Sequence, residues 1–280
     1  MHLFNANFLF TPQVIHHILS FCSENSYQHA DSLAASFKPV PAKGKEFFTE
    51  RIEYFGREFK SISSQLSPQS AKQLSGKFMT LNENFINMLE RIKFEALGGY
   101  PVIYQNIFHY LYEQRYFSFI MMNVKNSPNV LITTHFNAEP KLSKTYLLYN
   151  NLYFWSIIGG MHPGILLANS AFSKAVTANT KNELGDYITA FNGICFSLTV
   201  KRPSLQMNSL GEIYSEFKEI NTGFLNLLNG INNNSAGIYA PGMFASLPPS
   251  FFGGVRHMID EHTAIKEISD FDLSRINIPN

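Results

Sequence analysis

The sequence feature that most constrains the fold is a recurring helix start, a Ser or Thr followed by proline. Thr11-Pro12 precedes one long stretch with apolar residues three and four positions apart, and Ser67-Pro68 precedes another. A Ser or Thr side chain can accept a hydrogen bond from the first turn of a helix, and proline at the first helical position loses no hydrogen bond. The apolar spacing is that of one helix face. The sequence therefore predicts an all-α protein.

The predicted helices fall into two groups of four on either side of a linker. Residues 1–124 form the first four-helix repeat and residues 141–280 form the second. Residues 125–140 contain two prolines, several turn-forming residues and the short β-like run VLITT, so we expect a linker there. In the first repeat the helices begin near Pro12, Phe47, Pro68 and Pro101. In the second they run through YLLYNNLYFWSIIGG, from about Ser173 to Leu198, from near Pro203, and through FFGGVRHMIDEHTAIKEIS.

Matching residues in the two repeats indicate an internal duplication. FCSENSYQHADSLAAS at residues 21–36 aligns with FWSIIGGMHPGILLAN at residues 154–169. The matched pairs are Phe21 with Phe154, Ser23 with Ser156, His29 with His162 and Leu33 with Leu166. The last helix of each repeat then carries an HxxxE motif, and the second copy needs about fifteen extra residues, which the loop at residues 232–249 can absorb because loops tolerate insertions. We interpret the chain as two tandem up-down four-helix bundles.

Composition and charge exclude several classes of protein. The 280 residues are 45% hydrophobic, which supplies a substantial core. The net charge is +1 with Lys and Arg scattered, so we expect no nucleic-acid partner. Cys22 and Cys195 lie far apart in apolar segments and are expected to pack in the core of a reduced, cytoplasmic protein. No apolar run approaches the roughly 20 residues of a membrane span, and no signal peptide is evident.

Two short motifs carry the strongest chemical signal. HYLYE places His109 four residues before Glu113, and HMIDE places His257 four residues before Glu261. Residues four apart lie on the same face of a helix, one turn apart, so each pair can converge on one point. Helical bundles present metal ligands in this way. The alternative is an ordinary surface pair, which contributes only about 0.2–0.5 kcal/mol to helix stability.

The surroundings of both motifs favour burial. Aromatic and aliphatic residues crowd each motif on nearly every side of its helix. A buried carboxylate is costly unless it is paired with a cation or bound to a metal. Arg115 and Arg256, which lie beside the motifs in sequence, are possible partners of the two carboxylates. A metal-free interpretation in which these arginines neutralise the glutamates therefore stays open.

A histidine in the first helix of each repeat completes a ligand set. His29 and His162 lie at matching positions of the duplication. Two histidines and one carboxylate per repeat have the composition of the facial triad preferred by non-haem iron, and manganese or zinc can use the same groups. The six residues together would instead suit one dinuclear site. The sequence does not choose between these arrangements, and for each histidine a purely structural role in the core stays open.

Other polar residues are expected to lie outside the site. His17 and Glu24 lie about 120° or more from His29 around their helix, at about 100° per residue, and His16 is set aside with them. His2, His135 and His262 are expected to be solvated, since they fall in a terminus, in the linker and beside Glu261. The sequence contains no nucleophile elbow, phosphate loop, dinucleotide fingerprint or CxxC motif.

These features resemble a bacterial family of metal-binding, ferritin-like helical proteins of unknown function, with two four-helix repeats that each end in an HxxxE helix. The resemblance covers roughly residues 10 to 270. The stretches that carry it are FCSENSYQH, YPVIYQNIFHYLYEQRYFSFIM, FWSIIGGMHPGIL and HMIDEH.

The resemblance implies a set of metal-ligand positions: His29, His109, Glu113, His162, His257 and Glu261. Members of the family tend to carry a further Glu or His three residues before the FW position. This chain has Ile18 and Asn151 there, and Cys22 replaces the tryptophan that Trp155 supplies in the second repeat. The resemblance then implies either open coordination positions for a substrate or a loss of metal binding.

We therefore expect a metal-binding helical-bundle protein with a non-haem His/Glu site that holds iron or manganese, with zinc as a further option. If the protein is an enzyme, it is a metal-dependent oxidoreductase that binds dioxygen or a small molecule at the metal. Two alternative functions stay open: a metal-free helical scaffold or interaction protein, and a membrane-active helical bundle suggested by the many phenylalanines. Assembly into a homo-oligomer also stays open.

Overall fold

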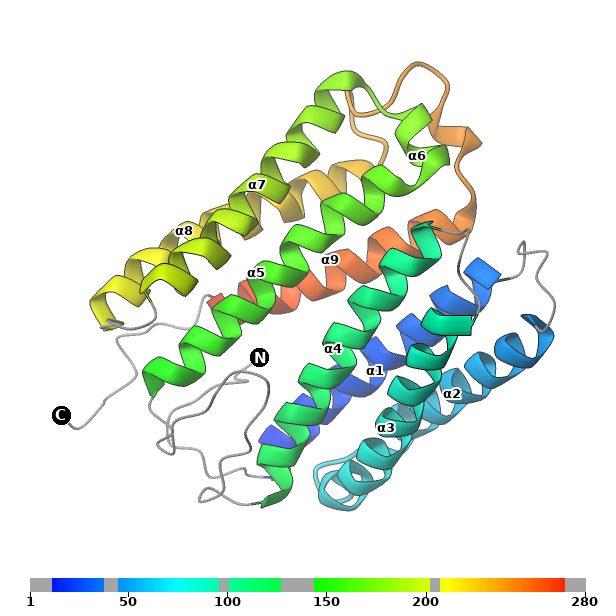
Figure 1. Ribbon diagram of the computed structural model, residues 1–280, viewed down its shortest axis with the longest axis vertical. Coiled ribbons are helices and arrows are strands. Elements are labelled where there is room, and N and C mark those ends of the chain that lie inside the picture. The colour runs from blue at the N-terminus through cyan, green and yellow to red at the C-terminus, as the bar shows by residue number, and fades with distance from the viewer. Residues whose placement is uncertain (1–11, 38–44, 96–100, 127–143, 202–206, 270–280) are drawn as a thin grey trace. The chain divides into compact units, whose positions relative to one another are not determined.

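The computed structural model describes residues 12–37, 45–95, 101–126, 144–201 and 207–269, and these segments are all-α apart from one isolated β-bridge. The prediction of an all-α protein is confirmed. The chain divides into two compact units (Figure 1), which we call the N-terminal unit, within Leu3–Lys141, and the C-terminal unit, within Leu142–Asn280.

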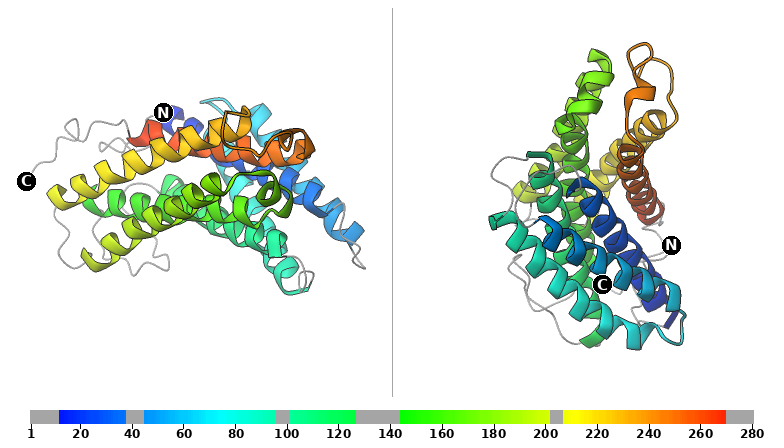
Figure 2. Two further views of the ribbon diagram at one scale, coloured as in Figure 1. Left: turned by 90° about the horizontal axis from the view of Figure 1, so that it is seen from above. Right: turned by 90° about the vertical axis from the view of Figure 1, so that its right-hand side faces the viewer.

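Four long helices form the described part of the N-terminal unit (Figures 1 and 2): α1 (Pro12–Phe37), α2 (Lys45–Gln65), α3 (Ala71–Glu95) and α4 (Pro101–Asn126). Helix α1 packs against each of the other three, α2 against α3, and α3 against α4. Because α1 contacts α4, a residue in the middle of one helix can meet a residue in the middle of the other.

The predicted helix starts of this unit are largely confirmed. Helices α1 and α4 begin at Pro12 and Pro101. Helix α3 begins at Ala71, three residues after the predicted Pro68, because a turn comes first. Ser67 still acts as the expected cap, since its Oγ accepts a hydrogen bond from the Ser70 amide at 3.2 Å and its carbonyl accepts one from the Ala71 amide at 2.9 Å.

Aromatic rings fill the space between α2 and α3. The Phe59 ring lies 5.7 Å from the Phe78 ring and 5.5 Å from the Phe85 ring, and Phe55 lies 5.2 Å from Phe85. All four side chains are buried. Removing one such ring from a core typically costs about 3–5 kcal/mol, so this layer is a major source of the unit's stability.

The C-terminal unit contains α5 (Lys144–Ala168), α6 (Ser170–Ala175), α7 (Ala178–Lys201), α8 (Met207–Asn232), the 3₁₀ turn η2 (Phe244–Ser246) and α9 (Pro249–Ser269). Helix α5 packs against α7, α8 and α9, while α7 packs against α8 and α8 against α9 (Figure 1). The same pairs of long helices are in contact as in the N-terminal unit, with α5, α7, α8 and α9 in the places of α1, α2, α3 and α4.

The prediction of one helix from about Ser173 to Leu198 is wrong, because this segment is divided between α6 and α7. Val176 is extended, with φ −88° and ψ 154°, and forms a bridge with Tyr239. Thr177 then starts α7, since its Oγ1 accepts a hydrogen bond from the Thr180 amide at 3.3 Å. A β-branched residue followed by an N-capping threonine favours this break locally, and the bridge to a distant loop fixes it.

The loop between α8 and α9, where the insertion is predicted, is held against the α6–α7 junction. The Ala240 amide donates to the Ala175 carbonyl at 2.9 Å, and the Thr177 amide donates to the Ile238 carbonyl at 2.9 Å. Gly237 and Gly242 adopt positive φ values of 84° and 76°, which only glycine takes without strain. The loop is therefore an ordered part of the C-terminal unit.

Helix α5 approaches α7 closely at Gly159. A Cβ added there would lie 2.5 Å from the buried ring of Phe191, which is shorter than any real contact. Glycine at this position therefore allows α5 to pack at its observed distance from α7. The same helix carries His162 one turn further along.

Two expectations fall largely outside the described residues. The predicted linker lies beyond them except for its first two positions, which belong to α4, and the VLITT run lies there entirely. The domain boundaries therefore stay a prediction. Among the described helices, none combines the length and the apolar character that crossing a bilayer requires.

Candidate metal-binding clusters

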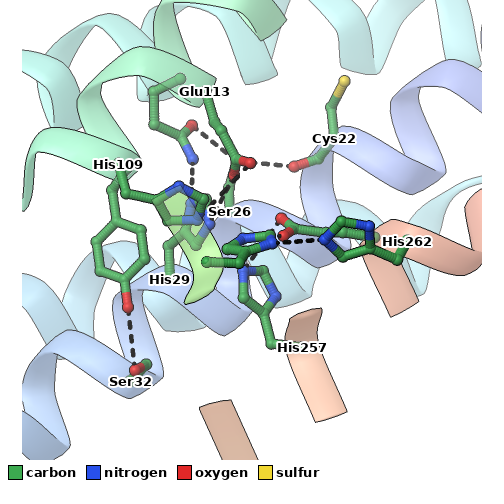
Figure 3. Close-up of polar contacts among 12 residues, drawn as sticks. Cys22, Ser26, His29, Ser32, His109, Glu113, His257 and His262 are labelled. Atoms are coloured by element: carbon green, nitrogen blue, oxygen red, sulfur yellow. Dashed lines mark hydrogen bonds and ion pairs between the residues drawn. The ribbon is translucent and has the colours of Figure 1, made fainter. Parts of the chain in front are cut away.

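The N-terminal unit brings the predicted residues His29, His109 and Glu113 together. His29 lies on α1 and the other two lie on α4, and all three are buried, with exposed fractions of 0%, 2% and 0%. His29 Nε2 lies 2.9 Å from Glu113 Oε2, and His109 Nε2 lies 3.7 Å from Glu113 Oε1 (Figure 3). One potential ligand atom from each residue lies within 4.8 Å of the others, a spacing that could hold a metal ion. We call these three residues the His29 cluster.

The other nitrogen of His29 is held by a buried polar chain. The side-chain amide of Gln114 lies 2.9 Å from His29 Nδ1, and the Ser26 hydroxyl lies 2.9 Å from Gln114 Oε1 and 2.7 Å from the Cys22 carbonyl (Figure 3). Asn82 on α3 donates to the Gln114 backbone carbonyl at 2.8 Å. These contacts fix the imidazole so that Nε2 points to Glu113.

An aromatic ring also restrains His29. Tyr110 stacks on the imidazole with a centroid distance of 4.1 Å. Its hydroxyl donates to Ser32 Oγ at 3.0 Å, one turn along α1 (Figure 3). The tyrosine therefore packs against the imidazole and ties α4 to α1 beside the cluster.

The C-terminal unit brings His162, His257 and Glu261 together in the same way. His162 lies on α5 and the other two lie on α9, with exposed fractions of 0%, 7% and 1%. His162 Nε2 lies 3.0 Å from Glu261 Oε2, and His257 Nε2 lies 3.1 Å from Glu261 Oε1. We call these three residues the His162 cluster.

His262 is the residue that the sequence interpretation placed wrongly. It was expected to be solvated, but it is fully buried and its Nε2 lies 2.8 Å from His162 Nδ1. Phe224 on α8 packs against its ring at a centroid distance of 4.8 Å. The position after a buried glutamate points about 100° around the helix, toward neighbours that the sequence does not reveal. The matching position after the first HxxxE motif holds another polar residue, Gln114, and this match is the sequence signal that could have indicated a shared role for the two positions.

The hydrogen bonds of Asn221 determine how His262 is protonated. Asn221 Nδ2 donates to the His262 backbone carbonyl at 3.0 Å, so its Oδ1 is the atom that faces His262 Nδ1 at 2.5 Å. An amide oxygen only accepts, so His262 Nδ1 carries the proton. In a neutral His262, Nε2 then accepts, and His162 Nδ1 is the donor. In a neutral His162, Nε2 is therefore unprotonated where it meets Glu261.

The two carboxylates are far from solvent, and the arginines considered as their partners point elsewhere. Arg115 is exposed and pairs with Glu90 on α3, and Arg256 is exposed on α9. Burial would raise the pKa of the Glu261 carboxyl, but the charge of His257 and the hydrogen bonds that His162 and His257 donate when protonated outweigh it and lower that pKa well below its usual range. The histidines of the cluster, rather than an arginine, therefore stabilise this carboxylate.

The remaining histidines of α1 lie apart from the cluster, as expected. His17 is exposed, His16 is partly exposed, and Glu24 is exposed and accepts a hydrogen bond from Ser63. His2 and His135 lie outside the described residues.

The interpretation of Ile18 and Asn151 as lost ligands of these clusters is wrong. Both are buried, and each lies eleven residues before the histidine of its helix. At 1.5 Å per residue this separation is about 16 Å along the axis, too far for two ligands of one ion.

Neither cysteine forms a disulfide, as expected. Cys22 is buried, and burial followed by the charge of Glu113 raises the pKa of its thiol far above the usual range. Burial raises the pKa of Cys195 to about 11. Cys195 is only partly buried, so the expectation of a core position holds for Cys22 alone.

Among known proteins, similarity to this chain is found at the level of the fold. A crystal structure of an uncharacterized protein from Bacillus cereus G9241 is similar, with a TM-score of 0.61 over 94% of this chain and 93% of that chain. The two sequences are 12% identical, so the likeness concerns the fold alone. No protein-family model matches the chain, and no curated protein matches it. The resemblance to a ferritin-like family therefore stays a hypothesis.

Proposed function

We propose that the protein binds one divalent metal ion at each cluster, through two histidines and one glutamate. The ligands are His29, His109 and Glu113 in the N-terminal unit and His162, His257 and Glu261 in the C-terminal unit. The observation that carries the proposal is the convergence of three buried ligand groups in each unit, from two helices that are distant in sequence. Surface HxxxE pairs need no second histidine and no burial.

The donor set fits a metal. An unprotonated His162 Nε2 and the Glu261 carboxylate face each other at 3.0 Å. A lone pair and a carboxylate oxygen repel at this distance unless a second proton or a cation lies between them. Imidazole nitrogen with carboxylate oxygen is the ligand combination of non-haem iron and manganese sites, and zinc also accepts it. We rank iron and manganese before zinc.

The proposed chemistry is oxidoreduction of a small molecule or dioxygen. A bound iron or manganese ion supplies redox chemistry, and three protein ligands leave coordination positions for a substrate. The protein contributes burial, which excludes bulk water, and hydrogen bonds that hold each imidazole in place. Tyr110 stacks on His29, and Phe224 packs against His262 beside the His162 cluster.

We further propose that the two units arose by duplication of one four-helix bundle. The contacts among α1, α2, α3 and α4 are repeated by α5, α7, α8 and α9 in the same order. An asparagine on the third long helix bonds to the backbone carbonyl that follows the glutamate in both units, Asn82 to Gln114 and Asn221 to His262. A shared contact of this kind is expected from common descent, because it depends on the register of two helices.

A metal-free scaffold is the second candidate. His29 lies 2.9 Å from Glu113 and His162 lies 3.0 Å from Glu261, so protonation of both histidines would make these contacts buried ion pairs that neutralise the two carboxylates. In this case the clusters would only lock helices together.

Metal content distinguishes the two candidates. Protein purified without added metal is reconstituted anaerobically with ferrous iron, and bound iron is measured by elemental analysis after gel filtration. We expect about two ions per chain. The absence of stoichiometric binding by the wild-type protein, with ferrous iron and with Mn²⁺, would contradict the metal proposal and support the scaffold.

A further inference from the structure

We propose that Gln114 and His262 are positioning residues that set which nitrogen of the first-helix histidine binds metal. The inference rests on the proposed function. Each residue follows the glutamate of its HxxxE motif and contacts Nδ1 of the histidine across the helix interface, His29 or His162. A metal-binding histidine generally donates its other N–H to a hydrogen-bond acceptor, which fixes both its tautomer and its ring orientation.

In the C-terminal unit the hydrogen bonds that link Asn221, His262 and His162 have fixed donors and acceptors when both histidines are neutral. Asn221 bonds to the backbone carbonyl of His262 and so presents its oxygen to that ring. His262 then accepts the Nδ1 proton of His162, which leaves the Nε2 lone pair directed at the Glu261 side of the cluster. All the side chains in this chain are buried, so water does not compete for these bonds.

In the N-terminal unit an amide takes the same place. In the structure Gln114 Nε2 lies 2.9 Å from His29 Nδ1, and the Ser26 hydroxyl lies 2.9 Å from Gln114 Oε1 and 2.7 Å from the Cys22 carbonyl. Turning this amide by 180° about its last bond would place its oxygen against His29 Nδ1, where it would accept the Nδ1 proton, and would let the Ser26 oxygen accept from the amide N–H. An amide reaches this arrangement by rotating about its last bond, whereas an imidazole is fixed by Asn221. With the amide turned in this way, both units present an Nε2 lone pair on the metal side.

The amide and the imidazole should therefore be interchangeable, but an apolar side chain should not replace either. His262→Leu keeps a similar volume and removes the acceptor for His162 Nδ1, and Gln114→Leu does the same for His29. His262→Gln restores an acceptor of the kind that the N-terminal unit uses. His262→Gln is therefore the rescue variant, and it places at position 262 the residue type that the N-terminal unit has at position 114.

The experiment measures Co²⁺ affinity by competition with a chelator, together with the visible absorption spectrum of bound Co²⁺. We expect His262→Leu to weaken one of the two sites by about 10- to 100-fold and to change its spectrum, as removal of outer partners of metal ligands does. His262→Gln should stay within about threefold of wild type, and Gln114→Leu should weaken the other site by a similar factor.

A purely structural role predicts a different pattern. In that case His262→Leu would lower the melting temperature of the metal-free protein while leaving Co²⁺ affinity and spectrum unchanged, and this result would overturn the inference. Failure of His262→Gln to restore affinity would overturn it as well. Ser26→Ala, which removes one hydroxyl, tests the N-terminal unit if the leucine variants do not fold, and an unchanged Co²⁺ affinity and spectrum there would count against the inference. If wild-type protein binds no metal at all, the proposed function fails first.

Discussion

The His29 cluster and the His162 cluster use the same three groups on matching helices, but their outer contacts differ. In both, the first-helix imidazole lies about one hydrogen-bond length from the glutamate, at 2.9 Å and 3.0 Å. The motif histidine lies 3.7 Å from the glutamate in the first cluster and 3.1 Å in the second. An amide supports His29, and an imidazole supports His162.

The comparison indicates that the three ligand groups are required for metal binding, whereas the residue that contacts Nδ1 of the first-helix histidine can vary. The three ligand groups cannot change without changing the coordination sphere, whereas any acceptor of suitable reach can hold Nδ1 of the histidine. The two units therefore serve as matched tests of each other.

The largest expected effect comes from removing a ligand. His109→Ala and His257→Ala should each lower bound iron from about two ions to about one per chain, because an ion with two remaining protein ligands is bound far more weakly. Elemental analysis after reconstitution checks this. His17→Ala, which alters an exposed histidine of α1, is the control and should keep both ions. Full metal content in both ligand variants would refute the assigned ligands.

Metal removal should lower the stability of the whole protein. An ion present at a hundredfold excess over its Kd stabilises the folded state by about 2.7 kcal/mol. The melting temperature should therefore fall on addition of a chelator and recover on addition of ferrous iron. His109→Ala and His257→Ala should each lose part of this recovery. Equal melting temperatures with and without metal in the wild-type protein would show that binding is not coupled to folding.

Acid should destabilise the metal-free protein partly through Glu261. The folded-state pKa of this carboxyl is lowered, so its contribution is fully present above the unfolded value of about 4.3 and is lost as the pH falls toward the folded pKa. Urea unfolding between pH 7 and pH 3 should show a decline that is about 1–2 kcal/mol smaller in Glu261→Gln. Glu53→Gln, at an exposed position of α2, is the control. Identical pH profiles for Glu261→Gln and wild type would show that Glu261 does not contribute to the acid sensitivity of the protein.

The smallest effect concerns the two thiols. Cys195 has a pKa of about 11 and is partly exposed, so its alkylation should be slow at neutral pH and should accelerate as the pH approaches that value. Cys22 is buried with its pKa raised further, so it should react only after unfolding. Mass spectrometry of peptides after iodoacetamide treatment measures both. Labelling of Cys22 in the folded protein at the rate of Cys195 would mean that the N-terminal unit opens readily.

Much of the architecture could be predicted from local patterns. The prolines at the starts of α1 and α4 act as expected, and the apolar spacing gives the correct class. The division between α6 and α7 was missed, because Val176 leaves the helix to pair with Tyr239, a residue far along the chain. A contact between distant segments leaves no periodic signal in either one.

The sequence by itself determined that the chain is helical and that His109 with Glu113, and His257 with Glu261, share helix faces, because four-residue spacing is a local property of the helix. Tertiary structure alone decided which side chains face them. It turned Arg115 outward to Glu90, placed His262 against His162, and buried both carboxylates among imidazoles. The physical reason is that burial and pairing depend on which neighbouring helix covers a face, and that choice is made by the packing of the whole unit.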